Sequence, residues 1–356
     1  MKRLATVLKI GLKLIAVLGI LMSLLLFGLL LFATLTRYRP AHEEVLMLQK
    51  GAKALPADLK IEALTWNIGY AGLGDDMDFF YDGGKQVRSD RQRTMENLCA
   101  IKAFLESQKE RDIILLQEVD RNAKRSWETD IYSAIQEVIP DASHFFAVNY
   151  RSPFVPVPIF NPLGKVHSGL VTISNIRPFH VSRHSYPGSY PWPGRLFNLQ
   201  RCFLLKRYEL SNGRQLLVVN THNSAFDDGS QRYRQMEFLQ EKLLAEYQQG
   251  NYIIAGGDWN QCPPGFSPDF QNHVFDYNEL LHIPKDIFPG WQWVYDPRFP
   301  TCRRLQKPYV SGQTPTTLID FYLISPNVEL IEVKTVDLGF INSDHNPVSA
   351  SFRLKN

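Results

Sequence analysis

The longest run of apolar positions in the chain lies near its N-terminus. Residues 14–36 contain no charged side chain, and fifteen of them are Leu, Ile, Val or Phe. As a helix that rises about 1.5 Å per residue, this run would reach roughly 34 Å, enough to cross a hydrocarbon core of about 30 Å. The pattern therefore predicts one transmembrane helix, with residues 1–36 forming a short N-terminal tip and the anchor.

A cleaved signal peptide is the alternative for the same run. Signal peptides carry a shorter apolar core of roughly 7–15 residues and end in a small-x-small cleavage site. Here the run ends in Ala33-Thr34-Leu35-Thr36-Arg37 without such a site, which favours an uncleaved anchor. Four basic residues precede the run and two follow it, so the positive-inside rule favours a single-pass protein of the cell membrane with a cytoplasmic N-terminus and an extracytoplasmic main domain.

Beyond the anchor, the pattern predicts a short helical or irregular stalk over residues 37–57 and one large domain over residues 58–356. Apolar residues recur at helical spacing in three segments of the domain, at residues 94–105, 131–138 and 236–247. Short apolar runs typical of buried strands occupy residues 61–66, 112–116, 170–173, 216–219, 252–255, 318–324 and 348–352. Alternating helices and strands predict an α/β fold, which places its chemistry beyond the strand tips.

Polar residues cluster at the ends of these predicted strands. Taken singly, an Asp or Asn after a strand is usually a turn former or a helix cap, and a histidine there is usually structural. Together, however, the clusters supply the hard oxygen ligands that Mg²⁺ prefers, and histidine–carboxylate pairs that can move protons. The clusters are Trp66-Asn67, Gln117-Glu118, Asn220-Thr221-His222, Gly257-Asp258-Trp259-Asn260, Asp320 and Ser343-Asp344-His345-Asn346.

These clusters carry a family resemblance. The segments LTWN, LLQEVD, VNTHNSAFD, AGGDWN, LIDFYLIS and SDHNPV resemble the motifs of the endonuclease/exonuclease/phosphatase (deoxyribonuclease I-like) superfamily, from about residue 60 to 352. The chain is similar to a membrane-anchored bacterial-type member. The resemblance implies a four-layer α/β (α+β) sandwich, in which two mixed β-sheets pack face to face with helices outside. It places the active site where the ends of both sheets meet.

The resemblance also implies a metal site and a reaction. Asn67, Glu118 and Asp344 match the metal ligands, with Mg²⁺ as the expected cofactor and Mn²⁺ as the alternative. Asp258 and Asn260 match the Gly-Asp-x-Asn motif, which orients or activates the attacking water and holds the phosphate. The implied reaction is metal-assisted, in-line attack of water on phosphorus, without a covalent enzyme intermediate.

Three further residues acquire catalytic roles by resemblance. His222 matches the histidine of the Asn-Thr-His motif, which contacts the phosphate or the leaving group. Asp320 matches the aspartate that hydrogen-bonds His345, and His345 would stabilise the phosphoryl group in the transition state. His167, at a strand start, is a further candidate for substrate contact, with a structural role as the commoner alternative. Trp259 departs from the more usual Phe or Leu, and we expect it to affect packing only.

Two other patterns bear on the chemistry. An acidic segment, residues 72–93, follows the predicted metal ligand Asn67; we expect a solvated loop there, with a second metal or a substrate-amine contact as the alternative. Four cysteines are widely spaced and form no CxxC pair, which argues against a zinc site or a dense disulfide framework. The cysteines are Cys99, Cys202, Cys262 and Cys302.

Charge and loop composition bear on the substrate. The chain has a formal net charge of +3, and because residues 1–39 hold six basic and no acidic side chains, residues 40–356 carry −3. Proteins that bind nucleic acid without regard to sequence usually carry a basic excess, so a lipid or small phosphoester is favoured over nucleic acid. Two Pro-rich apolar loops, residues 152–160 and 186–197, either cap the core or contact the bilayer or a lipid tail.

Three functions therefore stay open. A membrane-anchored, Mg²⁺-dependent phosphodiesterase or phosphatase is favoured. The alternative is a membrane-tethered extracytoplasmic nuclease. A non-catalytic phosphoester-binding module is less favoured, because every metal and phosphate group expected of the enzyme is present. No protein partner is inferred.

Overall fold

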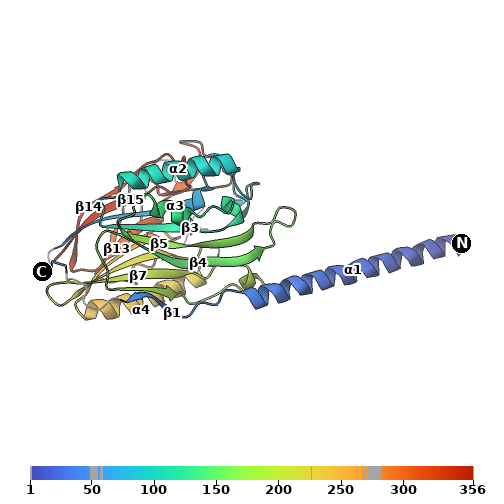
Figure 1. The fold of residues 1–356 in the computed structure, drawn as a ribbon, viewed down its shortest axis with the longest axis horizontal. Coiled ribbons are helices and arrows are strands. Elements are labelled where there is room, and N and C mark those ends of the chain that lie inside the picture. Colours follow the sequence, from blue (N-terminus) through green and yellow to red (C-terminus); the bar gives the residue numbers. More distant parts are fainter. Residues whose placement is uncertain are drawn as a thin grey trace.

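The computed structural model describes residues 2–48, 55–56, 59–225, 227–267, 270 and 282–355. At its N-terminus, α1 (Lys2–Thr36) projects as a single long helix from one end of the main domain (Figure 1). The segment Thr6–Thr36 is long and apolar enough to cross a membrane, and none of its most apolar window is buried. The predicted N-terminal apolar helix is therefore present, with the length of a membrane span or a signal sequence.

Strands of the described residues form two large mixed sheets and one small one. Within the large sheets, β2 runs parallel to β3 and β8 runs parallel to β9, whereas the other neighbouring strands are antiparallel. The seven-stranded sheet has the order β1 (Glu43–Leu48), β6 (His180–Ser185), β7 (Cys202–Glu209), β8 (Gln215–His222), β9 (Tyr252–Asp258), β13 (Asp320–Ile324) and β10 (Gln292–Val294). The six-stranded sheet has the order β14 (Val328–Thr335), β15 (Val348–Leu354), β2 (Lys60–Asn67), β3 (Ile113–Asp120), β5 (Gly164–Ser174) and β4 (Ser143–Val155), and the small sheet pairs β11 (Cys302–Arg303) with β12 (Thr316–Thr317).

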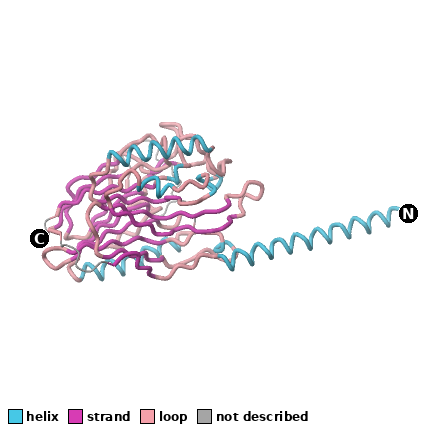
Figure 2. Tube along the Cα trace, viewed as in Figure 1, coloured by secondary structure: helices cyan, strands magenta, loops and turns pink. Residues whose placement is uncertain are grey.

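Helices cover the outer faces of both large sheets. Helices α2 (Arg91–Ser107) and α3 (Ile131–Gln136) lie on the six-stranded sheet, and α4 (Ser230–Gln248) lies on the seven-stranded sheet (Figures 1 and 2). Four short 3₁₀ turns complete the described elements: η1 (Gly69–Ala71), η2 (Phe80–Asp82), η3 (Lys124–Ser126) and η4 (Gly194–Leu196). The predicted four-layer sandwich of two face-to-face mixed sheets with outer helices is confirmed.

Alternating side chains explain why the central strands read as continuous apolar runs. In β2, Ile61 and Ala63 join the core between the two sheets, whereas Leu64 and Trp66 join the core beneath α2. The Trp66 ring meets the Phe104 ring of α2 edge to face at 5.2 Å. Because successive side chains of a strand point to opposite faces, a strand covered on both sides must be apolar at nearly every position.

Helix α2 shows how local sequence sets the boundaries of an outer element. Its N-cap residue Asp90 accepts a hydrogen bond from the backbone N–H of Arg93 at 2.8 Å, which satisfies one of the free donors of the first turn. Leu98, Ile101 and Leu105 form the buried stripe that packs on the sheet. The predicted helical spacing at residues 94–105 is thus observed.

The structure differs from the sequence prediction at the segment after the anchor. Residues 43–48, predicted as part of a helical or irregular stalk, form β1 and pair antiparallel with β6, with Glu44 opposite Arg183. The pairing partner lies 139 positions further along the chain, so local periodicity carried no sign of it. The division into anchor, linker and domain remains a prediction, with the addition that the linker contributes an edge strand.

Candidate active site

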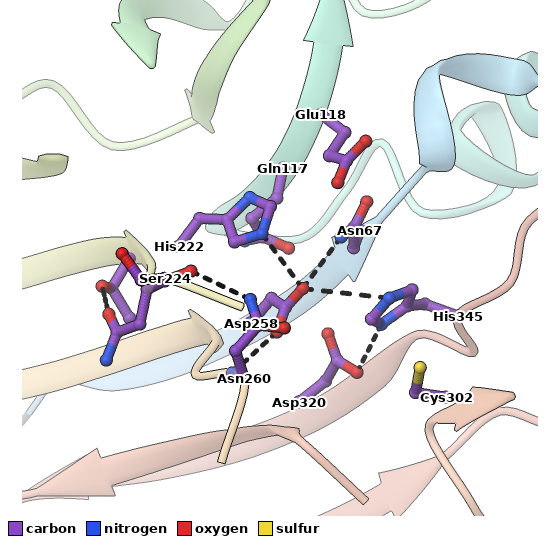
Figure 3. Close-up of polar contacts among 12 residues, drawn as sticks. Asn67, Gln117, Glu118, His222, Ser224, Asp258, Asn260, Cys302, Asp320 and His345 are labelled. Carbon is purple, nitrogen blue, oxygen red and sulfur yellow. Dashed lines mark hydrogen bonds and ion pairs between the residues drawn. The ribbon is translucent and has the colours of Figure 1, made fainter. Parts of the chain in front are cut away.

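The predicted catalytic clusters converge at one end of the two packed sheets (Figure 3). Asn67 is the last residue of β2, and Glu118 lies near the end of the neighbouring β3. His222 and Asp258 end the parallel strands β8 and β9, directly opposite one another. Asp320 begins β13 and pairs in register with Asp258. Strand direction alone therefore brings these five side chains to a common edge.

The carboxylate of Asp258 lies at the centre of the cluster and is buried. Its Oδ2 accepts a hydrogen bond from Nδ2 of Asn67 at 2.9 Å, lies 3.3 Å from Nε2 of His222 and lies 3.8 Å from Nε2 of His345. Its Oδ1 accepts from the backbone N–H of Asn260 at 2.9 Å. Asp258 thus links side chains that come from both sheets.

Two backbone positions near Asp258 have positive φ angles that favour the residues found there. Gly257 has φ +148°, and a Cβ there would lie 2.0 Å from the carbonyl oxygen of Thr221, so only glycine allows β8 and β9 to approach. Asn260 adopts φ +50°, a conformation that Asn tolerates better than most residues, and its Nδ2 donates to the carbonyl of Asn223 at 2.9 Å. Trp259 is fully buried and stacks on Phe321 at 5.3 Å, so its contacts are those of core packing.

His345 is held by Asp320. Nδ1 of His345 donates to Oδ2 of Asp320 at 2.7 Å, and both side chains are buried. Trp66 further fixes this segment by donating from Nε1 to the carbonyl of His345 at 2.9 Å. Burial by itself would lower the pKa of His345, but the surrounding carboxylates, Asp320 foremost, raise it well above its usual value. These carboxylates therefore favour the protonated form of His345.

The pKa of His222 is shifted in the opposite direction. Burial, followed by the positive charges of Arg201 and His345, holds the pKa of His222 well below its usual value. Its Nδ1 is buried without a hydrogen-bond partner among the described residues, whereas Nε2 faces Asp258. The two histidines around the same carboxylate therefore have pKa values shifted in opposite directions, and unequal environments of this kind separate acid from base roles.

The donor set of the predicted metal site fits a divalent cation. The pairing register of β3 shifts between Leu116 and Val119, and Glu118 there adopts φ +55°, an irregularity that redirects its side chain. Burial, together with the charge of Glu118, raises the pKa of Asp344 to about 6. The pKa of Asp82 is also raised to about 6, first by burial and then by the charge of Asp344. Neighbouring carboxylates that destabilise one another in this way are the oxygen ligands that Mg²⁺ prefers.

A second group of possible ligands lies nearby. Ligand atoms of Asp258, Asp320 and His345 lie within 4.8 Å of one another. Nδ1 of His345 and Oδ2 of Asp320 are already hydrogen-bonded to each other at 2.7 Å, so these two atoms are not free for a metal. The predicted set of Glu118, Asp344 and Asn67 offers carboxylate oxygens and the side-chain oxygen of Asn67, which accepts from the backbone N–H of Gly69 at 3.0 Å.

The site opens into a cavity of about 770 Å³. Sequence reasoning missed one of its lining residues, Arg201, which precedes β7 and belongs to no recognisable motif. Its Nε and Nη1 are buried without hydrogen-bond partners among the described residues, and burial lowers its pKa. A guanidinium with two nitrogens that lack partners among the described residues, beside the Asp258 cluster, is suited to bind an anion. The cavity wall also includes Tyr150, Leu163, Tyr190 and Leu199.

The sequence left two alternatives open for the acidic segment, residues 72–93, and two for His167, and the structure shows where these residues lie. Asp75 and Asp76 pair with Arg93 at the surface, whereas Asp82 lines the cavity. His167 does not line the cavity, and its ring meets the Phe146 ring edge to face at 5.8 Å. The next residue along β5, Ser168, is the one that faces the cavity, so this placement gives no support to the predicted substrate contact of His167.

Comparison with known proteins identifies the family. The sequence profile of the endonuclease/exonuclease/phosphatase family matches residues 64–345. The chain belongs to this family. Its members are metal-dependent hydrolases of ester bonds, in agreement with the catalytic cluster described above.

Curated relatives cover parts of the chain. The UPF0294 protein of Vibrio campbellii is 32% identical over 104 residues, 29% of this chain and 34% of the relative. The UPF0294 protein of Vibrio parahaemolyticus is 26% identical over 210 residues, 59% of this chain and 57% of the relative. The matches thus span between about a third and somewhat over half of the length of these relatives.

Solved structures share the fold at low sequence identity. An endonuclease/exonuclease/phosphatase from Beutenbergia cavernae has a TM-score of 0.56 at 18% identity, covering 83% of this chain and 72% of its own. TDP2 from Caenorhabditis elegans has a TM-score of 0.52 at 15% identity, covering 83% and 74%. The human Nocturnin catalytic domain with bound sulfate has a TM-score of 0.51 at 14% identity, covering 89% and 100%.

Proposed function

We propose that this chain is a membrane-anchored, Mg²⁺-dependent phosphodiesterase or phosphatase. The observation that carries the proposal is the convergence of two histidines on the buried carboxylate of Asp258, with Nε2 of His222 at 3.3 Å and Nε2 of His345 at 3.8 Å from its Oδ2. In this proposal residues 1–36 hold the anchor, residues 37–57 link it to the enzyme, and residues 58–356 form an extracytoplasmic catalytic domain.

Side chains of the site can align and polarise the reactants. Asp258, held by Asn67 and by the Asn260 backbone, is oriented to accept a proton from an attacking water. His345, charged and fixed by Asp320, would donate from Nε2 to a phosphoryl oxygen as negative charge develops there. Neutral His222 would contact the phosphate or the leaving oxygen from the opposite side of Asp258.

A divalent cation completes the proposed site. Glu118, Asp344 and Asn67 would hold it, in keeping with their mutual repulsion and oxygen donors. When bound, such a cation neutralises charge on the phosphate oxygens and on the leaving oxygen. Mg²⁺ is the proposed ion because it is bound by a few carboxylate oxygens together with substrate phosphate.

We favour a lipid or other small phosphoester as the substrate. A cavity of about 770 Å³ falls in the range of about 300–1,000 Å³ common for small-molecule sites. Its wall combines the aromatic and aliphatic side chains of Tyr150, Tyr190 and Leu163 with the guanidinium of Arg201. This combination suits an ester that carries both an apolar part and an anionic phosphate.

A membrane-tethered nuclease is the second candidate. One structural neighbour, TDP2 from D. rerio, is complexed with a single-strand DNA product, with a TM-score of 0.50 and 13% identity. The net charge of −3 over residues 40–356 weighs against this candidate. A non-catalytic binding module is less favoured still, because Asp258, the two histidines and the proposed cation ligands all lie together.

A substrate panel tests the proposal. The full chain is incubated with Mg²⁺ and with plasmid DNA, sphingomyelin, lysophospholipids or inositol phosphates, and the released products are quantified. We expect hydrolysis of a lipid or small phosphoester and little cleavage of DNA. Efficient DNA cleavage with no turnover of the other substrates would support the nuclease instead.

A further inference from the structure

Exposed apolar side chains gather at the turn that joins β4 to β5. Phe160 is fully exposed at 101% of its reference area, and Ile159 is exposed at 81%. Phe154 and Val157 are exposed nearby, and we call these four residues the apolar tip. Trp192, exposed at 59%, lies in the loop that leads into η4. A single exposed apolar residue needs no explanation, but a cluster of this kind marks an interaction surface.

The apolar tip belongs to the part of the domain that touches α1. Helix α1 contacts both β4 and η4, and its residue Ala33 is buried at 4% exposure. Ala33 lies three residues before the end of the helix, about 4–5 Å inside the apolar span along its axis. Figure 1 shows the β4–β5 turn pointing in the same direction as α1. The β4–β5 turn and α1 therefore project from the same end of the domain.

Contacts at the base of α1 hold this arrangement. The Tyr38 ring lies beneath the guanidinium groups of Arg151 and Arg183, 5.8 and 5.9 Å from its centroid, and its hydroxyl donates to Glu44 at 3.4 Å. Glu44 belongs to β1, which is itself an edge strand of the seven-stranded sheet. The helix is therefore joined to the domain by side-chain contacts and sheet pairing directly beyond its last turn, and these fix its direction relative to the apolar tip.

Basic residues surround the end of α1 that meets the domain. Arg37 and Arg39 follow the last turn of α1, and Arg195 of η4 lies close enough to Arg37 for their charges to interact. Arg151 of β4 stands over Tyr38. Guanidinium groups next to exposed apolar side chains match the two layers of a membrane surface, in which anionic head groups cover the acyl chains.

The segments that carry the exposed residues also line the catalytic cavity. Leu163, at the end of the β4–β5 turn, and Tyr190, two residues before Trp192, both form part of its wall. The cavity therefore extends from the Asp258 cluster toward the side of the domain that faces the membrane. This continuity places the mouth of the cavity beside the exposed apolar residues.

We propose that the apolar tip and Trp192 insert into the phospholipid bilayer beside α1 and hold the mouth of the catalytic cavity at the membrane surface. The partner is the lipid surface itself, since its charge and layering match the Arg and apolar groups described above. The inference rests on the membrane anchor proposed above, and it does not depend on the hydrolysis proposed for the site.

The depth of a fluorescent label, attached to the apolar tip, in a lipid bilayer tests this inference. Phe160→Cys is made in a Cys99→Ser background, because Cys99 is exposed whereas Cys202, Cys262 and Cys302 are buried. The full chain is labelled with nitrobenzoxadiazole and reconstituted into vesicles of phosphatidylethanolamine and phosphatidylglycerol. The matched control is Ile331→Cys, which replaces another exposed apolar residue, on β14 at the end of the domain away from α1 (Figure 1).

We expect the probe at position 160 to show blue-shifted emission, strong quenching by lipids spin-labelled near the head group, and several-fold weaker quenching by iodide than the probe at position 331. Equal iodide quenching at the two positions would overturn the inference. A blue shift at 160 without quenching by spin-labelled lipid would also overturn it, because protein and not lipid would then cover the tip. No turnover is measured, so failure of the proposed hydrolysis would leave this result unchanged. Release of the unlabelled chain from membranes by alkaline wash would instead remove the anchor on which the inference rests.

Discussion

Nδ1 of His345 lies 2.7 Å from Oδ2 of Asp320, and the two buried side chains form a hydrogen-bonded pair beside the carboxylate of Asp258. The sequence places them 25 positions apart, in a strand and in the loop before the last strand. Asp320 raises the pKa of His345 and fixes its ring, so that Nε2 points toward the side where Asp258 and His222 meet.

This pairing predicts non-additive effects of mutation. His345→Ala should lower kcat by about 10²–10³-fold with a small change in KM, because a preorganised donor acts mainly in the transition state. Asp320→Asn should act in the same direction but more mildly. The double mutant should be little worse than His345→Ala alone, since residues that work as a unit are not additive. Steady-state kinetics of the three variants decide this, and strictly additive losses would mean that the pair does not act together.

Glu118→Gln should separate the proposed metal site from the rest of the cluster. The substitution keeps the shape of the side chain but removes its charge, so activity should fall by orders of magnitude while excess Mg²⁺ restores part of it. A chelator should abolish activity of the unmodified chain. Glu106→Gln, at an exposed position on α2, is the matched control and should change neither activity nor its Mg²⁺ dependence. Full activity of the Glu118 variant in the presence of chelator would rule out the metal mechanism.

Arg201→Gln should weaken substrate binding. Within the described part of the chain, two nitrogens of this cavity-lining guanidinium have no hydrogen-bond partner, so a substrate anion is its natural counterion. Loss of a hydrogen bond to a charged group costs about 1.5–3 kcal/mol, which corresponds to a rise in KM of roughly ten- to a hundred-fold. The exposed Arg353→Gln is the control. An unchanged KM in the Arg201 variant would exclude this residue from substrate binding.

Membrane fractionation tests the anchor. If residues 14–36 remain uncleaved, the chain should stay in the membrane fraction after an alkaline wash, and its N-terminal sequence should begin at or near Met1. Soluble protein whose sequence starts near residue 37 would identify the apolar helix as a signal sequence.

The sequence predicted best those parts of the fold that are covered on both faces. Strands β2 and β9 are short runs of apolar residues with polar ends, and both lie where the runs predicted them. Strand β6 was missed because its sequence, HVSRHS, is polar. Its Arg183 is buried through a hydrogen bond from Nε to the carbonyl of Val148 at 2.8 Å, a long-range contact that no local pattern indicates.

The candidate site shows the same limit. Motifs predicted that Asn67, Asp258 and His345 would meet, and the strand ends bring them together. Arg201 carries no motif and reaches the cavity only through the path of the chain before β7. His167 and Ser168 are neighbours on one strand, but only Ser168 lines the cavity. Which of two adjacent strand residues faces a site depends on the pairing register, and the register is fixed by tertiary packing.

Comparison of the unmodified full chain with Asp258→Asn tests the central claim most directly. Asp258 is the carboxylate on which both histidines converge, and the substitution preserves its shape while removing the proton acceptor. With Mg²⁺ and the best substrate of the panel, the unmodified chain should hydrolyse the phosphoester. Asp258→Asn should lower kcat by about 10²–10⁴-fold, whereas the exposed Asp141→Asn should leave it unchanged. Hydrolysis by a folded Asp258→Asn variant at the rate of the unmodified chain would contradict the account.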